Sequence, residues 1–153
     1  PEDRVALADF VQGCANIATV VIVKGNHDKD GDLDLLARLV ADFPITVYSG
    51  PAVYRQANIV MPVLPWIDRI LPIESVAGYS AAAAKVAEEA RLVEILRALH
   101  DEAHGPLTRP GDVVVFAGHL MLDRAVPGLG QPDQRGREFV LTLDHLKIVD
   151  AQA

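Results

Sequence analysis

The stretch VVIVKGNHD, residues 20–28, decides the fold that this sequence predicts. It opens on a continuous β-branched run, which is typical of a strand buried in a parallel sheet. The strand ends at a polar turn made of Gly25, Asn26, His27 and Asp28. In sheets of this kind, ligands gather at the carboxyl ends of the strands. The turn is therefore the first candidate for a functional site.

Outward from this strand, helical and strand patterns alternate and predict one α/β domain over residues 1–153. The expected helices cover residues 1–16, 32–42, 79–104 and 144–153. The expected strands cover residues 19–24, 45–48, 53–55, 58–64, 112–117 and 137–143, with 53–64 forming a hairpin. Loops are expected around Trp66 and over residues 127–136.

The bulk composition excludes several classes of protein. Half of the residues are hydrophobic, which is globular rather than disordered composition. The net charge of -7 argues against a protein that coats DNA non-specifically, because such proteins are basic. The single cysteine, Cys14, can form no intrachain disulfide, and no apolar stretch is long enough for a transmembrane helix. The expected location is the cytoplasm.

The polar turn carries residue types that suit phosphate and metal chemistry. Asn26 offers a neutral oxygen ligand to a cation. His27 can donate a proton to, or stabilise charge on, a phosphate oxygen. Asp28 can orient the His27 imidazole through its second ring nitrogen. The alternative is a turn whose polar side chains only satisfy backbone groups.

A second strand, DVVVFA at residues 112–117, also ends at a polar pair, Gly118 and His119. With GNHD after one hydrophobic strand and VVVFAGHLMLDRA at residues 113–125, the chain resembles the calcineurin-like metallophosphoesterases. The segment IVMPVLPW, residues 59–66, is similar to a strand and turn of the SbcD-type DNA-repair exonuclease subunits.

This resemblance implies a site and a reaction. Asn26 and His119 would ligate the same one of two divalent metal ions, of the Mn²⁺ type. His27 would act on the scissile phosphate, with Asp28 as its orienting partner. The implied fold is part of a metallophosphoesterase β-sandwich flanked by helices. The implied activity is phosphodiester hydrolysis, with DNA as substrate, an ATPase of the SbcC type as partner, and a homodimer as the assembly.

The sequence departs from that family at its remaining motifs. The Asp-x-His, Gly-Asp-x-x-Asp and Gly-His-x-His blocks, which carry most of the family's metal ligands, do not occur in the chain. We therefore expect a partial domain that lacks N- and C-terminal elements of the family, and a segment that is inactive alone. Two other functions stay open, a phosphoesterase acting on nucleotides or other small molecules and a non-catalytic module that binds a partner.

Three further features have competing interpretations. The string NHDKDGDLDLLA, residues 26–37, is similar to a calcium-binding EF-hand loop, but Ala37 replaces the required Glu and a strand precedes it. His100 and His104 lie four residues apart on an expected helix, where placement near its C-terminus explains them better than a metal site. His145 is expected at the surface or in a helix cap, and Trp66 as a packed anchor of its loop.

Overall fold

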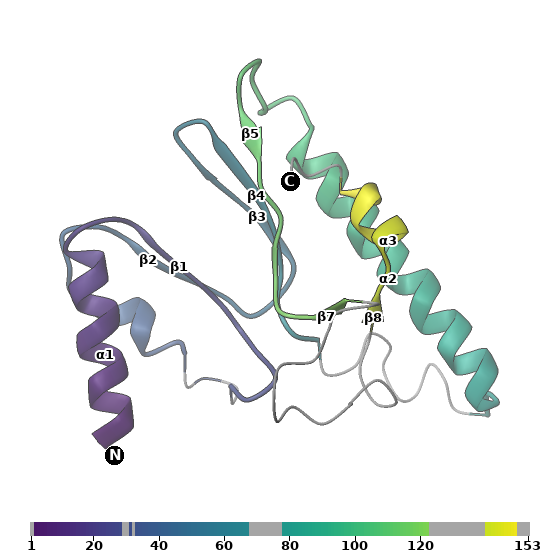
Figure 1. Cartoon of the computed structure of the whole chain (residues 1–153), viewed down its shortest axis with the longest axis horizontal. Helices are drawn as coiled ribbons and strands as arrows, with labels where there is room; N and C mark the ends of the chain where they lie inside the picture. The colour runs from purple at the N-terminus through teal and green to yellow at the C-terminus, as the bar shows by residue number, and fades with distance from the viewer. Residues whose placement is uncertain (1, 29–30, 32, 68–77, 123–139, 150–153) are drawn as a thin grey trace.

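A computed structural model of the chain describes residues 2–28, 31, 33–67, 78–122 and 140–149, and these form a mixed α/β architecture (Figure 1). In chain order the elements are α1 (Glu2–Ala15), β1 (Val20–Val23), η1 (Leu36–Arg38), β2 (Ile45–Tyr48), β3 (Ala52–Gln56), β4 (Ile59–Leu64), α2 (Ala81–Ala103), β5 (Val113–Val114), β6 (Ala117–Gly118), β7 (Met121–Leu122), β8 (Val140–Leu141) and α3 (Leu143–Ile148). The α/β class that the sequence predicts is confirmed.

Strands β1 and β2 form a parallel pair in which Val20 lies beside Ile45. Both strands were expected, and the parallel pairing of β1 is confirmed. The expectation that β1 is fully buried is wrong, because all four of its residues are only half-buried. A small core forms where Val11 of α1 packs with Leu33 and Leu36 against the pair.

The expected helix over residues 32–42 is wrong, because over residues 33–42, which the structure describes, only the short 3-10 turn η1 forms. Leu33 and Leu36 reach the core, whereas Val40 is 84% exposed. In an α-helix the carbonyl of Val40 would accept a hydrogen bond from residue 44, and Pro44 has no N–H to donate. The Val40 carbonyl accepts instead from the side chain of Gln12 in α1.

The larger sheet is built on the hairpin of β3 and β4, which the sequence predicts. Ala57 at its turn adopts a φ of 51°, and the antiparallel register places Gln56 opposite Ile59. Helix α2 covers β4 and supplies three leucines to the main core. That core consists of Leu64, Leu92, Leu96, Leu99, Leu141 and Val149.

The guanidinium of Arg55 fastens the hairpin to the C-terminal end of α2. It donates to the backbone carbonyls of Glu102 and Ala103, and to the hydroxyl of Thr108 over 2.9 Å. The last carbonyls of a helix have no partner within the helix and carry partial negative charge. A cation from a neighbouring strand therefore caps α2.

The strand expected over residues 112–117 forms, but as two pieces. β5 and β6 both pair with β4 in parallel and keep one register, with Val60 beside Val114 and Val63 beside Ala117. Between them, the N–H of Val115 donates to Val60. The next bond of a regular parallel ladder would run from residue 62 to the carbonyl of Val115, and Pro62 has no N–H. Proline therefore divides one strand into β5 and β6.

The C-terminal elements were predicted in part. β8 pairs in parallel with β7, and α3 follows, beginning one residue before the region 144–153 that was expected to be helical. Residues 127–136, 137–139 and 150–153, which also carried predictions, lie outside the described part of the chain.

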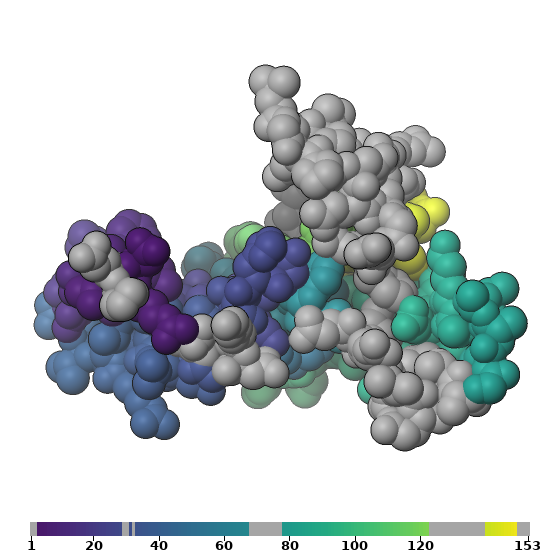
Figure 2. Space-filling view, turned by 90° about the horizontal axis from the view of Figure 1, so that it is seen from below, coloured from purple at the N-terminus to yellow at the C-terminus, as the bar shows by residue number. Residues whose placement is uncertain are grey.

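The view from below places α1 and the segment before β2 at one end of the molecule and α2 at the other (Figure 2). Across the ranges given above, no helix combines the length and the apolarity needed to cross a membrane.

Candidate functional site

The turn after β1 brings one polar side chain back onto its own backbone. The Asp28 carboxylate accepts a hydrogen bond from the Gly25 N–H, with Oδ2 2.7 Å from the nitrogen. Gly25 is buried, whereas Asn26 and His27 are exposed. This turn therefore projects an amide and an imidazole from the carboxyl end of β1.

His119 stands at the equivalent place on the larger sheet. It follows β6, whose Gly118 pairs with Leu64 at the end of β4. The His119 N–H donates to the Leu64 carbonyl over 3.1 Å, so the parallel ladder fixes its backbone. The residue itself is exposed. A second strand end thus presents an imidazole to solvent.

A backbone hydrogen bond joins the two sheets at these tips. The N–H of Trp66, just after β4, donates to the carbonyl of Lys24, just after β1, over 2.8 Å. Lys24 in turn donates its own N–H to Tyr48 at the end of β2. The ends of β1, β2, β4 and β6 therefore meet at one edge.

Asn26 and His119 converge at that edge although 93 positions separate them in the sequence. The Asn26 Oδ1 lies 3.2 Å from the His119 Nε2. In the tautomer that carries its proton on Nε2, the ring donates a hydrogen bond to the amide oxygen. The sequence named both residues as ligands of one metal ion, and their side chains do lie together.

The same separation suits two ligands of one cation. With ligand distances of about 2.0–2.2 Å, a gap of 3.2 Å between donor atoms corresponds to an angle of about 95–105° at the ion. That angle lies between those of octahedral and tetrahedral coordination. An amide oxygen and an imidazole nitrogen also suit divalent transition metals. These two residues fit two positions around a Mn²⁺-type ion.

The rest of a metal site is not assembled in the part of the chain that the structure describes. No group of three or more His, Cys, Asp or Glu side chains that could hold a metal ion occurs among those residues. Asn26 and His119 are both neutral, so neither offsets the charge of a dication. Asn26 and His119 could therefore supply only some of the ligands that a divalent cation needs.

The predicted catalytic residues, His27 and Asp28, follow Asn26 in the same turn, but the structure shows no hydrogen bond between their side chains. His27 makes no hydrogen bond to another residue within the described ranges, Asp28 included. The carboxylate of Asp28 holds the turn through Gly25 instead. Phosphate chemistry by His27, and orientation of His27 by Asp28, stay predictions.

Gly25 makes the approach of the two tips sterically feasible. A Cβ atom at this position would lie 2.9 Å from Cε1 and 3.0 Å from Nδ1 of His119. Contacts that short do not occur between a real Cβ and a neighbouring carbon. The imidazole of His119 therefore rests against the bare backbone of Gly25.

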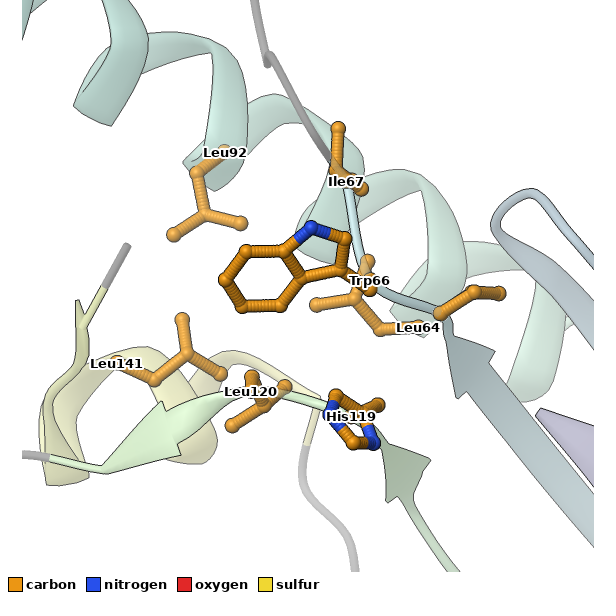
Figure 3. Close-up of a pocket in the computed structure, with 8 residues that line it drawn as sticks. Leu64, Trp66, Ile67, Leu92, His119, Leu120 and Leu141 are labelled. Atoms are coloured by element: carbon orange, nitrogen blue, oxygen red, sulfur yellow. The ribbon is translucent and has the colours of Figure 1, made fainter. Parts of the chain in front are cut away.

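The contact between Trp66 and His119 was not predicted from the sequence. The two ring centroids lie 6.2 Å apart with the planes at 82°, an edge-to-face arrangement. Both rings line a small pocket of about 30 Å³ (Figure 3). The lining residues are Leu64, Pro65, Trp66, Ile67, Leu92, His119, Leu120 and Leu141. One sequence signal could have predicted the contact between Trp66 and His119: each residue follows the end of an expected strand.

Two histidines outside the site have structural surroundings. His100 lies near the C-terminal end of α2, with its Nδ1 3.3 Å from the Asp101 carboxylate, and His104 is the C-cap of that helix. Their rings lie close together, with centroids 4.5 Å apart and planes tilted by 32°. This placement agrees with the helix-end interpretation.

His145 forms a capping box at the start of α3. Its Nδ1 accepts from the Thr142 N–H over 3.1 Å, and its own N–H donates to the Thr142 hydroxyl. The capping role expected for His145 is confirmed, but the side chain is buried at 8% exposure rather than lying at the surface.

The EF-hand interpretation has no support from the local fold. The strand β1, not a helix, precedes the loop, and Leu33 packs into the core. Residues 29, 30 and 32 of that string lie outside the described part of the chain.

Among sequences, no protein-family model matches this chain, and neither does any of the curated proteins with which it was compared.

Proposed function

We propose that this chain is part of a metal-dependent phosphodiesterase in which Asn26 and His119 hold one divalent cation. The observation that supports it is the 3.2 Å approach of Asn26 Oδ1 to His119 Nε2 at the shared edge of two sheets. The GNHD turn and the single histidine after a later strand are the two features that suggested a metallophosphoesterase. Their meeting is what such a site requires.

Four residues of the chain have a role in this proposal. Asn26 and His119 present neutral donor atoms from two rigid strand ends. His27, exposed beside them, protonates the leaving oxygen of the substrate or stabilises negative charge on the phosphate. Asp28 holds the turn that presents both Asn26 and His27. A pair of divalent cations, when bound, neutralises charge on the phosphate and activates a water molecule.

The finer points of the proposal come from the resemblance alone. They are a metallophosphoesterase sandwich, two Mn²⁺-type ions, DNA as substrate in a repair nuclease of the SbcD type, an SbcC-type ATPase partner and a homodimer. The further carboxylate and histidine ligands would have to be supplied in addition to Asn26 and His119. We expect no hydrolysis by this chain in isolation.

The sole tryptophan gives a direct test of the metal site. Trp66 lies beside His119, so a Co²⁺ ion used in place of Mn²⁺ and bound at His119 should quench its fluorescence in a saturable manner. Asn26→Ala and His119→Ala should each abolish the saturable part. A double variant, His100→Ala with His104→Ala, should keep it, because these histidines lie at the C-terminal end of α2 and not among the residues that line the pocket with Trp66.

A non-catalytic module is the second candidate, and one observation favours it. The contact between Asn26 and His119 is also an ordinary hydrogen bond that ties two sheets together. In that case Asn26→Ala would lower the melting temperature, and Co²⁺ would quench the wild type and the His119→Ala variant alike.

The substrate is tested on a protein that combines this chain with the three family blocks. Mn²⁺-dependent cleavage of linear duplex DNA would support the nuclease. Cleavage of a chromogenic phosphodiester alone would support a small-molecule phosphoesterase, in keeping with the net charge of -7. His27→Gln should lower the rate of either reaction by about 10²–10⁴-fold while metal binding persists.

A further inference from the structure

The imidazole of His119 would be mobile if its own backbone were its only constraint. The hydrogen bond from the His119 N–H to Leu64 fixes the main chain, but two side-chain torsions remain free. An exposed side chain at a strand end samples several rotamers, and ordering it costs conformational entropy. A ligand that must be ordered at the moment of binding gives a weaker site.

Two neighbours restrict that ring in the structure. The first is Gly25, whose backbone lies against Cε1 and Nδ1 of the imidazole. The second is the indole of Trp66, in edge-to-face contact with it. With Cε1 and Nδ1 against Gly25, the remaining nitrogen, Nε2, is the one near Asn26.

Trp66 is itself held by contacts that do not involve His119. Its backbone N–H donates a hydrogen bond to the carbonyl of Lys24. Its ring lies among leucines and an isoleucine that line the same pocket (Figure 3). Leu92 of α2 and Leu141 of β8, two of those neighbours, belong to the main core. The indole therefore has constraints of its own, and it can in turn restrain the imidazole.

We propose that Trp66 is a positioning residue, which holds the His119 imidazole with Nε2 toward Asn26 before any cation binds. The indole touches neither substrate nor ion and acts through the imidazole alone. Neighbours that orient a metal ligand through a hydrogen bond raise metal affinity about 10- to 100-fold in other sites, and we expect an aromatic contact to act at the lower end of that range. The metal-binding part of this inference rests on the proposed function, whereas the orientation of the ring does not.

Nuclear magnetic resonance on the metal-free chain tests the orientation. In the wild type, a strong Overhauser effect is expected between the His119 Hε1 and the Gly25 Hα protons. Trp66→Leu should weaken it at least twofold relative to fixed backbone proton pairs, and Trp66→Phe, which keeps an aromatic ring, should restore most of it. Leu92→Val is the matched control, because it loosens the same pocket from α2.

Titration with Mn²⁺ alone, followed by water proton relaxation, tests the consequence. Trp66→Leu should weaken Mn²⁺ binding about tenfold, Trp66→Phe about twofold to threefold, and Leu92→Val not measurably. A structural role alone would lower the melting temperature of all three variants with the Overhauser effect and the affinity unchanged, and that result would overturn the inference. Failure to bind Mn²⁺ at His119, both in this chain and in a protein that adds the three family blocks, would instead overturn the proposed function, with the Overhauser comparison still deciding the role of Trp66.

Discussion

The His119 imidazole lies so close to Gly25 that a methyl group on residue 25 would come within 2.9 Å of its Cε1 atom. The far end of this side chain can rotate away, and that movement would take Nε2 from Asn26. The smallest substitution at one strand tip therefore acts on a side chain delivered by another sheet.

Replacement of Gly25 by alanine should disrupt the candidate site more than the fold. We expect Co²⁺ quenching of Trp66 fluorescence to need about tenfold or more added metal, because the ligand is displaced. Gly13→Ala is the control, since no heavy atom lies within 4 Å of the Cβ it would add in α1. It should stabilise the protein by about 0.5–1 kcal/mol and leave quenching unchanged. Equal quenching in wild type, Gly25→Ala and Gly13→Ala would contradict the close approach of the His119 ring to Gly25.

Gly118→Ala should destabilise the protein itself. The added Cβ would lie 2.7 Å from Leu120 Cδ2, 3.1 Å from Phe116 Cε1 and 3.3 Å from the Leu64 carbonyl oxygen. Overpacking of this kind costs about 1–3 kcal/mol. Urea denaturation should show a lower midpoint with an unchanged slope, and a midpoint equal to that of wild type would contradict the prediction.

Loss of the Arg55 cap should weaken the attachment of α2 to the hairpin. Arg55→Met keeps the aliphatic part of the side chain and removes its bonds to Glu102 and Thr108. We expect a loss of about 1–3 kcal/mol in the free energy of unfolding, measured by urea denaturation. The reason is that removal of the charged donor leaves carbonyls at the end of α2 unpaired.

The matched control for that change is Arg91→Met. Arg91 pairs with Glu94 on the exposed surface of the same helix, with the two side chains 52% and 63% exposed. Exposed pairs of this type contribute at most about 1 kcal/mol, so a smaller loss is expected than for Arg55. The prediction would be refuted by similar losses in the two variants.

Alkaline pH should destabilise the chain partly through Tyr48. Burial, assisted by the nearby Tyr54 and Glu102, raises the pKa of its phenol above 10.0. From about pH 10 upward the unfolded chain releases this proton while the folded chain retains it, so stability falls as the pH rises toward the folded pKa. Tyr48→Phe should therefore lose less stability than wild type between about pH 8 and about pH 11.

Thermal unfolding at the two pH values measures this effect. Tyr79→Phe removes a hydroxyl from a residue that is 55% exposed and serves as the reference. Equal alkaline loss in wild type and Tyr48→Phe would show that this phenol does not contribute.

The strand ends of the candidate site could be predicted because they depend on local patterns. β-Branched runs marked β1 and β5, and each run ends at a polar residue that its backbone direction delivers to one edge. The convergence of Asn26 with His119 was foreseen on this basis and by resemblance. Its cause was not foreseen, because the Trp66–Lys24 bond depends on how two separate sheets dock.

The failures have equally specific causes. Residues 32–42 have helical periodicity, but Pro44 removes the donor that the Val40 carbonyl would need, and Gln12 takes that carbonyl instead. Of the two positions expected for His145, the helix cap forms, but its burial could not be predicted because it comes from a tertiary contact with Glu89 of α2, with 3.9 Å between Nε2 and Oε1. Periodicity describes one segment at a time and contains no such information.

The proline that divides β5 from β6 also leaves the strand before His119 very short. Because Pro62 cannot donate a hydrogen bond to β5, Ala117 and Gly118 pair with β4 as a short separate strand. Fraying of those two residues would withdraw His119 while the hairpin above stays intact. The chain thus carries the His119 imidazole at the end of a two-residue strand, whose pairing with β4 is much shorter than that of the β3–β4 hairpin.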